Sequence, residues 1–194
     1  MNKTLLLAAI ALPFASRAQS TVPPADEQIA AAILPLPADL RAGAKVLGYR
    51  AANKLEVLRD GKNGIICLAL YVTRPDFHVA CYHDGLEPFM ARGRALRDSG
   101  VTGDKVDTVR FREIKSGKLK MPAQGMLYEL FAKKTDWNAA TRKLSNANAL
   151  TVLYVPFATA ATTGLSTAPT DNGPWLMLPG TPKAHIMIAG KMSM

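Results

Sequence analysis

The fold of this chain is decided by the stretch Gly64-Ile-Ile-Cys-Leu-Ala-Leu-Tyr-Val72 and by the run that follows it, Phe77-His-Val-Ala-Cys-Tyr82. The first run carries no charge and is rich in branched apolar side chains, which is typical of a central strand buried on both faces. Pro75-Asp76 predicts a turn between the runs. The second run is therefore expected to return beside the first as the other half of a hairpin-like unit.

Each run contains one of the two cysteines of the chain, Cys67 and Cys81. An isolated pair in an oxidising compartment most simply forms a disulfide. A thiolate metal site is the alternative, but the 13 residues between the cysteines do not match the paired C-x-x-C spacing of zinc ligands. We therefore expect a disulfide between Cys67 and Cys81, no metal site and no cofactor.

Segments on both sides of this unit extend the sheet and add helices. Short apolar or alternating runs predict strands at 45–50, 54–59, 126–132, 150–156 and 183–189. Apolar periodicity predicts a helix at 25–34, while residues 135–149 are polar and are expected to make a helical excursion. Strands come first in hairpins, then helices, then strands again. This order predicts an α+β fold, a single domain with a mainly antiparallel sheet and a few helices.

Two further helices are expected between the hairpin and the later strands. Asp84 and Glu87 have capping-box spacing and Pro88 lies in the first turn of the helix that ends at Ser99-Gly100. Residues 102–116 carry acidic side chains early and basic ones late, which suits the helix macrodipole. The alternation around Val109 leaves a strand as the competing interpretation of 102–116.

The N-terminal residues have the pattern of a secretory signal peptide. Lys3 supplies a positive n-region, residues 5–14 form an uncharged and mainly apolar run of 10 residues, and Ser16-Arg17-Ala18 offers small residues at a cleavage site. Such a run is too short to cross a bilayer, which needs roughly 20 apolar residues. We expect cleavage near Ala18, a mature domain of residues 19–194, and a periplasmic or secreted protein without a transmembrane segment.

The composition is that of a folded, basic protein. Hydrophobic residues make up 48% of the chain and charged residues 20%, so a disordered chain is excluded. The formal net charge is +9, and about +7 after loss of the signal peptide. Nine basic and four acidic residues lie in the window 91–120, where they are interspersed. Aromatic residues are scarce there, so no nucleic-acid partner is expected.

Several blocks of the chain resemble a set of uncharacterised exported bacterial proteins. These blocks are Asn63-Gly64 with Cys67, the segments 90–97 and 113–122, Tyr154-Val-Pro-Phe-Ala-Thr159 with Thr163-Gly164-Leu165, and Pro174-Trp-Leu-Met-Leu-Pro-Gly-Thr-Pro182 with Ala184-His-Ile-Met-Ile188. The resemblance covers most of the mature chain. It implies an exported single domain, and it implies no activity and no catalytic residue.

Known catalytic signatures, including the G-x-S-x-G elbow, the phosphate-binding loop and H-E-x-x-H, are absent from the sequence. A dispersed site remains conceivable on His185 together with His83 and Asp84. Alternation along an extended chain places His78 and His83 on opposite faces, so these two histidines are not expected to share a metal. Asp84 also has the plainer role of a helix-capping group.

A second candidate is the basic cluster Arg92, Arg94 and Arg97, because guanidinium groups capture carboxylate or phosphate in bidentate fashion. Structural salt bridges are the competing role for these side chains. Arg97 falls near the centre of the apolar stripe, which is unusual for a charged residue. The partner of this cluster would be an anionic small molecule or an envelope component.

Three functions follow, of which the first is favoured. The protein is expected to be a non-catalytic exported binding or structural domain, because a disulfide and a regular core pattern occur without a catalytic signature. The alternatives are an envelope-acting hydrolase with a dispersed His/Asp site, and a basic surface that binds an anionic polymer or lipid headgroup. The hydrolase requires His185 to share a cleft with another titratable group.

Overall fold

The computed structural model describes residues 22–51, 54–170 and 173–191. The expected signal peptide, residues 1–18, lies outside the described residues. Within the described ranges, no helix has both the length and the apolar character needed to cross a membrane.

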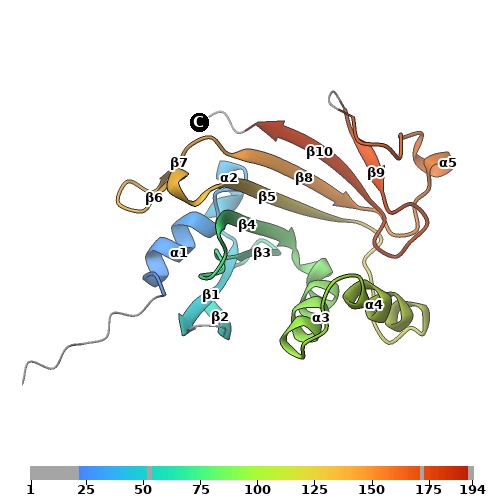
Figure 1. The fold of residues 1–194 in the computed structure, drawn as a ribbon, viewed down its shortest axis with the longest axis horizontal. Helices are drawn as coiled ribbons and strands as arrows, with labels where there is room; N and C mark the ends of the chain where they lie inside the picture. The colour runs from blue at the N-terminus through green and yellow to red at the C-terminus, as the bar shows by residue number, and fades with distance from the viewer. Residues whose placement is uncertain (1–21, 52–53, 171–172, 192–194) are drawn as a thin grey trace, which may run out of the picture.

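Strands dominate the described chain, and short helices are placed between them (Figure 1). The helices are α1 (Ala25–Ala32), α2 (Ala38–Arg41), α3 (Glu87–Asp98), α4 (Lys105–Lys115) and α5 (Ala160–Thr163), with the 3-10 turns η1 (Asp84–Leu86) and η2 (Lys134–Asp136). The strands are β1 (Lys45–Ala51), β2 (Lys54–Arg59), β3 (Ile65–Leu68), β4 (Asp76–His83), β5 (Gly125–Lys133), β6 (Trp137–Asn138), β7 (Lys143–Leu144), β8 (Asn148–Tyr154), β9 (Trp175–Met177) and β10 (His185–Lys191).

The strands form an eight-stranded sheet in the order β2-β1-β3-β4-β5-β8-β10-β9, and β6 and β7 form a separate two-stranded hairpin. Neighbouring strands of the large sheet run antiparallel, except that β1 and β3 are parallel. The fold is therefore α+β with a mainly antiparallel sheet, as the order of elements predicts. The expected helix at 102–116 is confirmed as α4, and the competing strand is not formed.

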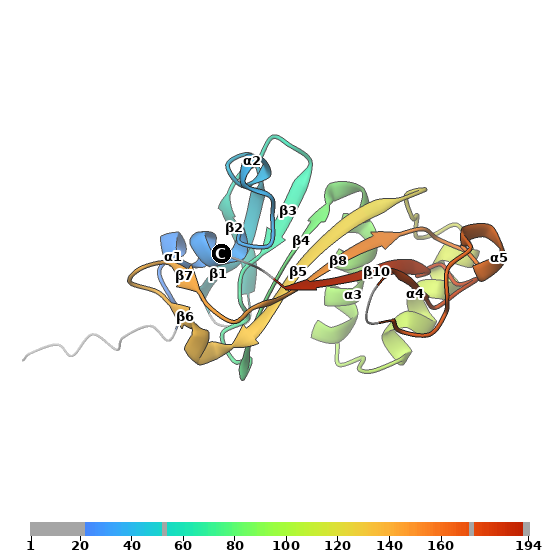
Figure 2. The same ribbon diagram turned by 90° about the horizontal axis from the view of Figure 1, so that it is seen from above.

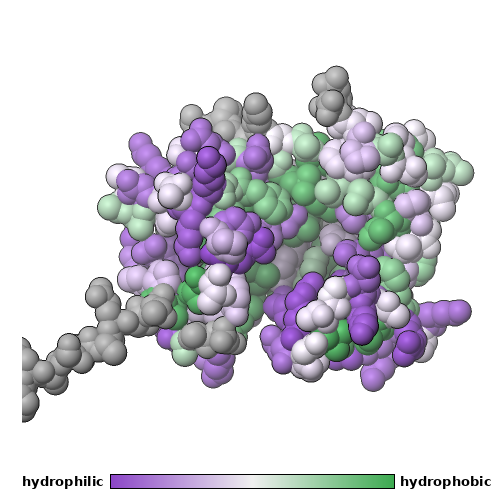
Figure 3. All heavy atoms as spheres, viewed as in Figure 1, coloured by the Kyte–Doolittle hydropathy of each residue, from purple (hydrophilic) through white to green (hydrophobic). Residues whose placement is uncertain are grey.

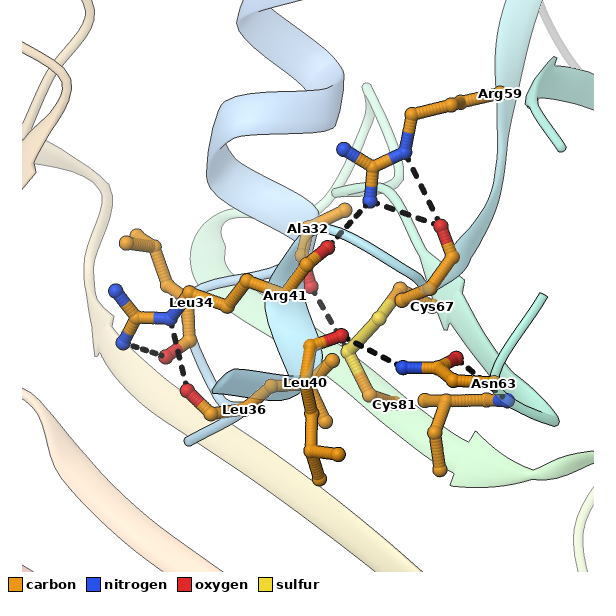
Figure 4. Close-up of a disulfide and its surroundings, with 11 residues drawn as sticks. Ala32, Leu34, Leu36, Leu40, Arg41, Arg59, Asn63, Cys67 and Cys81 are labelled. Carbon is orange, nitrogen blue, oxygen red and sulfur yellow. Dashed lines mark hydrogen bonds between the residues drawn. A yellow bond between two sulfur atoms is a disulfide. The ribbon is translucent and has the colours of Figure 1, made fainter. Parts of the chain in front are cut away.

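The Cys67–Cys81 disulfide joins two residues that face each other across β3 and β4. Both cysteines are fully buried in a cluster with Ala32 and Leu36, which come from α1 and the turn after it. The Sγ atom of Cys81 lies 3.1 Å from the carbonyl oxygen of Ala32 (Figure 4). Because a disulfide sulfur carries no hydrogen, this is a packing contact. The side of the sheet that bears the disulfide, covered by α1, is called the disulfide face below.

Helices α3 and α4 pack on the opposite side, called the helix-pair face. Figures 1 and 2 show the two helices side by side, away from α1 and α2. Tyr82 of β4 anchors α3, since its hydroxyl donates to Glu87 at 2.5 Å and accepts from Arg94 at 2.9 Å. Arg94 also donates to Glu87 at 2.6 Å, so the three side chains form a closed network. Burial of Tyr82 raises its pKa, which keeps the phenol neutral.

The central strand is shorter than its sequence pattern predicts. The apolar run 64–72 predicts one long strand, but β3 ends at Leu68. Beyond it, the amide of Ala69 donates to Leu47 of β1, and a turn between Tyr71 and Arg74 then ends the extended chain. An apolar run predicts that its side chains are buried, but not that they lie in a strand. Leu70 is packed beneath α1 and β6–β7 although it lies beyond the end of β3.

Two further expectations are corrected. The helical excursion expected at 135–149 is not formed: residues 137–144 make the β6–β7 hairpin, because Leu144 and Trp137 pair and pack against Phe77. Asp84 and Glu87 do not form a capping box: no side chain caps α3, and η1 precedes it. Glu87 is already held by Tyr82 and Arg94, which removes it from that role. Pro88 does lie in the first turn of α3.

Candidate functional site

The residues considered for catalysis, His83, Asp84 and His185, do not meet in the structure. His185 pairs with Tyr154, and Tyr154 pairs with Gly125 of β5. Three strand spacings, roughly 14 Å, therefore separate β10 from β4, which lies on the other side of β5. His83 also continues the alternation of Cys81 on the disulfide face, whereas His185 stacks on Tyr154 on the helix-pair face. The sheet stands between these groups, so they form no common cleft.

His185 is held in one orientation by its own loop. Its Nδ1 atom lies 2.6 Å from the carbonyl oxygen of Lys183. A carbonyl only accepts, so Nδ1 carries the hydrogen. Burial lowers the pKa of His185, although the bond to Lys183 acts in the opposite direction, and the ring is 8% exposed. The neutral imidazole is therefore a packed part of the sheet.

His83 has a local role at the end of β4. Its Nδ1 atom accepts from the amide of Gly85 at 3.2 Å and so caps η1. Asp84 lies beside it, with its Oδ1 atom 3.6 Å from the same nitrogen. The exposed ring also borders an open cavity of about 490 Å³ that Gln124 and Met126 help to line.

The three arginines considered for anion binding have different environments. Arg92 makes a bidentate pair with Glu113 at 2.8 and 2.6 Å, which ties α3 to α4. Arg94 belongs to the network with Glu87 and Tyr82. Arg97 is exposed at the end of α3, and no acidic partner for it exists among residues 22–51, 54–170 and 173–191. Two of the three guanidinium groups are thus engaged within the fold.

A buried polar cluster links α4 to the loop before β10. Asp107 accepts from both Arg110 and Lys183, the latter at 2.8 Å. Burial would raise the pKa of Asp107, but these two cations hold it below its ordinary value. Arg110 lies over the ring of Phe89 at 3.7 Å, and Gly93 makes room for it, since a Cβ at 93 would lie 2.8 Å from Nη1. The cluster fastens α4 to that loop, and its charges are paired with one another. The buried Nε atom of Arg110 has no hydrogen-bond partner among the described residues.

A histidine–carboxylate pair on the helix-pair face was not singled out by the sequence. His78 of β4 donates from Nε2 to Glu129 of β5 at 2.9 Å. The same imidazole stacks on Phe131, its partner across the strands, with ring centres 4.5 Å apart and planes 10° apart. Both side chains of this hydrogen-bonded pair are partly exposed, at 22% and 17%. The pair fixes the ring of Phe131 against one side of the imidazole.

A pocket of about 690 Å³ opens beside this stack. The strand register places Phe131 between His78 and Asn148, so the ring face opposite the imidazole points toward Asn148. Lining groups come from β4, β5, η2 and the loop before β8: Asp76, Phe131, Lys133, Thr135, Asn146 and Asn148. Asn146 has a left-handed backbone, with φ at 51°, and donates to Asp136 at 3.3 Å. The pocket therefore combines one flat aromatic surface with amide, hydroxyl, ammonium and carboxylate groups.

The same face of the sheet continues past the pocket, since Ala80 and Leu150 follow His78 and Asn148 by two residues on β4 and β8. Figure 3 shows the surface hollowed between the β1–β2 hairpin and the α3–α4 pair, with the middle strands at the back. Register places these partly exposed side chains on that part of the sheet: Leu47, Tyr49, Leu68, Ala80 and Leu150. The exposed ring of Tyr71 lies against that of Tyr49, with ring centres 5.5 Å apart. Burial, followed by the influence of Tyr71, raises the pKa of Tyr49 to about 12. The hollow is thus a largely apolar floor beside the Phe131 pocket, in which Glu129 lies between Ala80 and Leu150.

No group of three or more His, Cys, Asp and Glu side chains suited to a metal exists in the described part of the chain. No protein-family model, no curated protein and no solved structure matches this chain.

Sequence reasoning missed Glu129 and Phe131 for a definable reason. Both belong to an apolar strand in which they alternate with Leu130, and that alternation assigns them to one face. Only the register of β4 against β5 shows that this face also carries His78. The useful signal was a carboxylate inside an otherwise apolar strand, since a partly buried carboxylate requires a partner.

Proposed function

We propose that this protein is an exported, non-catalytic binding domain that holds a sugar ring of an envelope glycan in the Phe131 pocket. The observation that carries the proposal is the fixed aromatic ring: His78 covers one side of Phe131 and the pocket leaves the other side toward Asn148. The apolar face of a sugar ring packs on such a surface, while its hydroxyl groups both donate and accept hydrogen bonds. Amide and carboxylate groups beside the ring match that pattern.

The polar groups around the pocket support binding rather than catalysis. His78 is paired with Glu129, and Arg74 makes a bidentate pair with Asp76 at 2.9 Å. A general acid or base needs a free proton-transfer position within reach of the ligand. Because these side chains are paired, the pocket offers a ligand its shape, an aromatic surface and hydrogen-bonding groups. The export signal predicted from the sequence and the Cys67–Cys81 disulfide are in keeping with a place among envelope glycans.

The proposal is tested by NMR titration of the purified protein with tri-N-acetylglucosamine and, separately, maltotriose. Binding should shift the resonances of Phe131 and Asn148. The exchange Phe131→Leu keeps an apolar side chain but removes the ring, and should weaken binding about two- to tenfold. Phe157→Leu is the matched control, because it makes the same exchange at an exposed site outside the pocket.

Three outcomes would count against the proposal. Neither glycan binds, or the shifts lie elsewhere on the surface, or Phe131→Leu binds as well as the parent protein. Mass spectrometry of the same samples addresses the alternative of an envelope-acting hydrolase, because shortened glycan products would require a catalytic group. The mass of the protein also reports whether residues 1–18 have been removed.

A further inference from the structure

The end of the molecule around α5 exposes two large apolar side chains, Phe157 and Leu178. Phe157 is 56% exposed and Leu178 is 39% exposed, although residues of this kind are usually buried. They come from two loops that are far apart in sequence. Backbone bonds join the loops: Phe157 donates to Thr181, and Gly180 donates to Ala158, each at 2.8 Å. The two side chains therefore belong to one apolar tip, defined here as residues 155–158 and 178–182.

The backbone at both positions is left-handed. The φ angle is 66° at Phe157 and 51° at Leu178. Glycine adopts this conformation at no cost, whereas bulky side chains adopt it rarely and with strain. A strained backbone that holds an apolar side chain in solvent serves no packing purpose. Positions of this kind gather where a protein contacts a ligand or a partner.

The tip carries no charge, and Asp171 is the single charged residue between positions 155 and 182. Residues 155–170 and 173–182 contain no Asp, Glu, Lys or Arg. Burial of Phe157 and Leu178 in a bilayer interface would therefore bring with it no charged side chain of residues 155–158 and 178–182. An uncharged apolar tip is suited to the boundary between lipid headgroups and hydrocarbon.

A basic helix lies at the same end of the molecule. Figures 1 and 2 both place α4 and α5 at that end, and the ion pair between Asp107 and Lys183 joins α4 to the loop that follows the tip. Residues 101–120 contain six basic and three acidic side chains. The exposed cations without an ion pair among the described residues are Lys105, Arg112, Lys115, Lys118 and Lys120. Such a surface attracts anionic headgroups.

We propose that Phe157 and Leu178 insert into the interface of an anionic lipid bilayer, which the cations of α4 attract. This membrane contact goes beyond the proposed glycan site and does not depend on it. A second copy of the chain is a poorer occupant, because two ends with this excess of positive charge repel each other. The two loops thus act as an anchor that brings the domain to a membrane surface without spanning it.

The test is sedimentation of the purified protein with vesicles of phosphatidylcholine that contain 30% phosphatidylglycerol. Mass spectrometry identifies the N-terminus of the protein used. The variant is the double exchange Phe157→Gly and Leu178→Gly. Roughly half of each side chain is available to enter the hydrocarbon, so the partition coefficient should fall about thirtyfold. Glycine relieves the left-handed strain, so the urea midpoint should stay the same or rise. Val57→Ser, at another exposed apolar residue, is the matched control and should bind like the parent.

Further measurements separate the explanations. Binding should be weak on pure phosphatidylcholine and should decrease in 0.5 M salt. The proposal is overturned if the glycine variant binds the anionic vesicles as well as the parent does. It is also overturned if the variant loses stability, since the two side chains would then serve the fold. Self-association on size-exclusion chromatography that Leu178→Gly abolishes, without vesicle binding by the parent, would assign the tip to a second copy.

Discussion

Reduction of the Cys67–Cys81 disulfide should lower the free energy of unfolding by about 3 kcal/mol. The bridge closes a loop of 15 residues, and in the chain-entropy model this loop restricts the unfolded chain by that amount. In urea, with a slope of about 2 kcal/mol per molar for a domain of this size, the midpoint should fall by about 1.5 M. The thermal midpoint should fall by about 6–12 °C.

The assay compares urea unfolding of the oxidised protein with that of protein unfolded and refolded in reductant, because both sulfurs are fully buried in the native state. The double variant Cys67→Ala and Cys81→Ala is the control. It also loses the packing of two buried sulfur atoms among Ala32 and Leu36, about 1 kcal/mol each, so it should be less stable than the reduced protein. Its midpoint should not respond to reductant.

Equal midpoints for oxidised and reduced protein, within about 0.3 M urea, would refute the reasoning. Such a result would mean that the unfolded chain is already compact near the bridge, so that the loop constrains nothing further. A loss well above 5 kcal/mol in the reduced protein would also contradict it, because the native packing around the cysteines would then depend on the bond itself.

Two other perturbations test the fold. Gln28→Leu should lower the free energy of unfolding in urea by about 2–4 kcal/mol. The buried Gln28 amide bonds both the N–H and the carbonyl of Tyr49, and the exchange would leave both groups unsatisfied. A loss below about 0.5 kcal/mol would contradict this. Burial lowers the pKa of His185, so the unfolded chain takes up a proton at this residue at a higher pH than the folded chain does. The contribution of the neutral His185 to the free energy of unfolding is therefore fully present above about pH 6.5 and is lost as the pH falls through the folded pKa. The stability of the parent relative to His185→Phe should therefore decrease from pH 7.5 to pH 5, and a constant difference would show that His185 is not the group responsible.

Much of the fold could be predicted from local patterns. The hairpin of β3 and β4, the disulfide between its strands, and helices α1, α3 and α4 follow from apolar runs, turn residues and helical periodicity. Each of these signals is local in sequence, and the cysteine pair adds one long-range constraint. The prediction failed at residues 135–149, where the polar composition concealed a hairpin held by the packing of Trp137 and Leu144. Tertiary contacts outweighed local preference there.

Less of the candidate site could be predicted. Sequence reasoning considered His185 with His83 and Asp84, and the structure places the sheet between them. Glu87 has the spacing of a capping residue, but Tyr82 and Arg94 use its carboxylate instead. Spacing along the chain shows which groups share an element. It does not show which groups another element brings within hydrogen-bond distance.

The sequence by itself determined the mainly antiparallel α+β architecture, the partner of each cysteine and the excess of positive charge, because composition and period decide these properties. Only the tertiary structure decided that Phe131 lies between His78 and Asn148, and that the loops of Phe157 and Leu178 meet. Strand register and loop contact join residues that are distant in sequence. A shift of one residue in the pairing of β5 would move Phe131 away from the face that carries His78 and Asn148, and the pattern within one strand does not name the residue opposite it in the next.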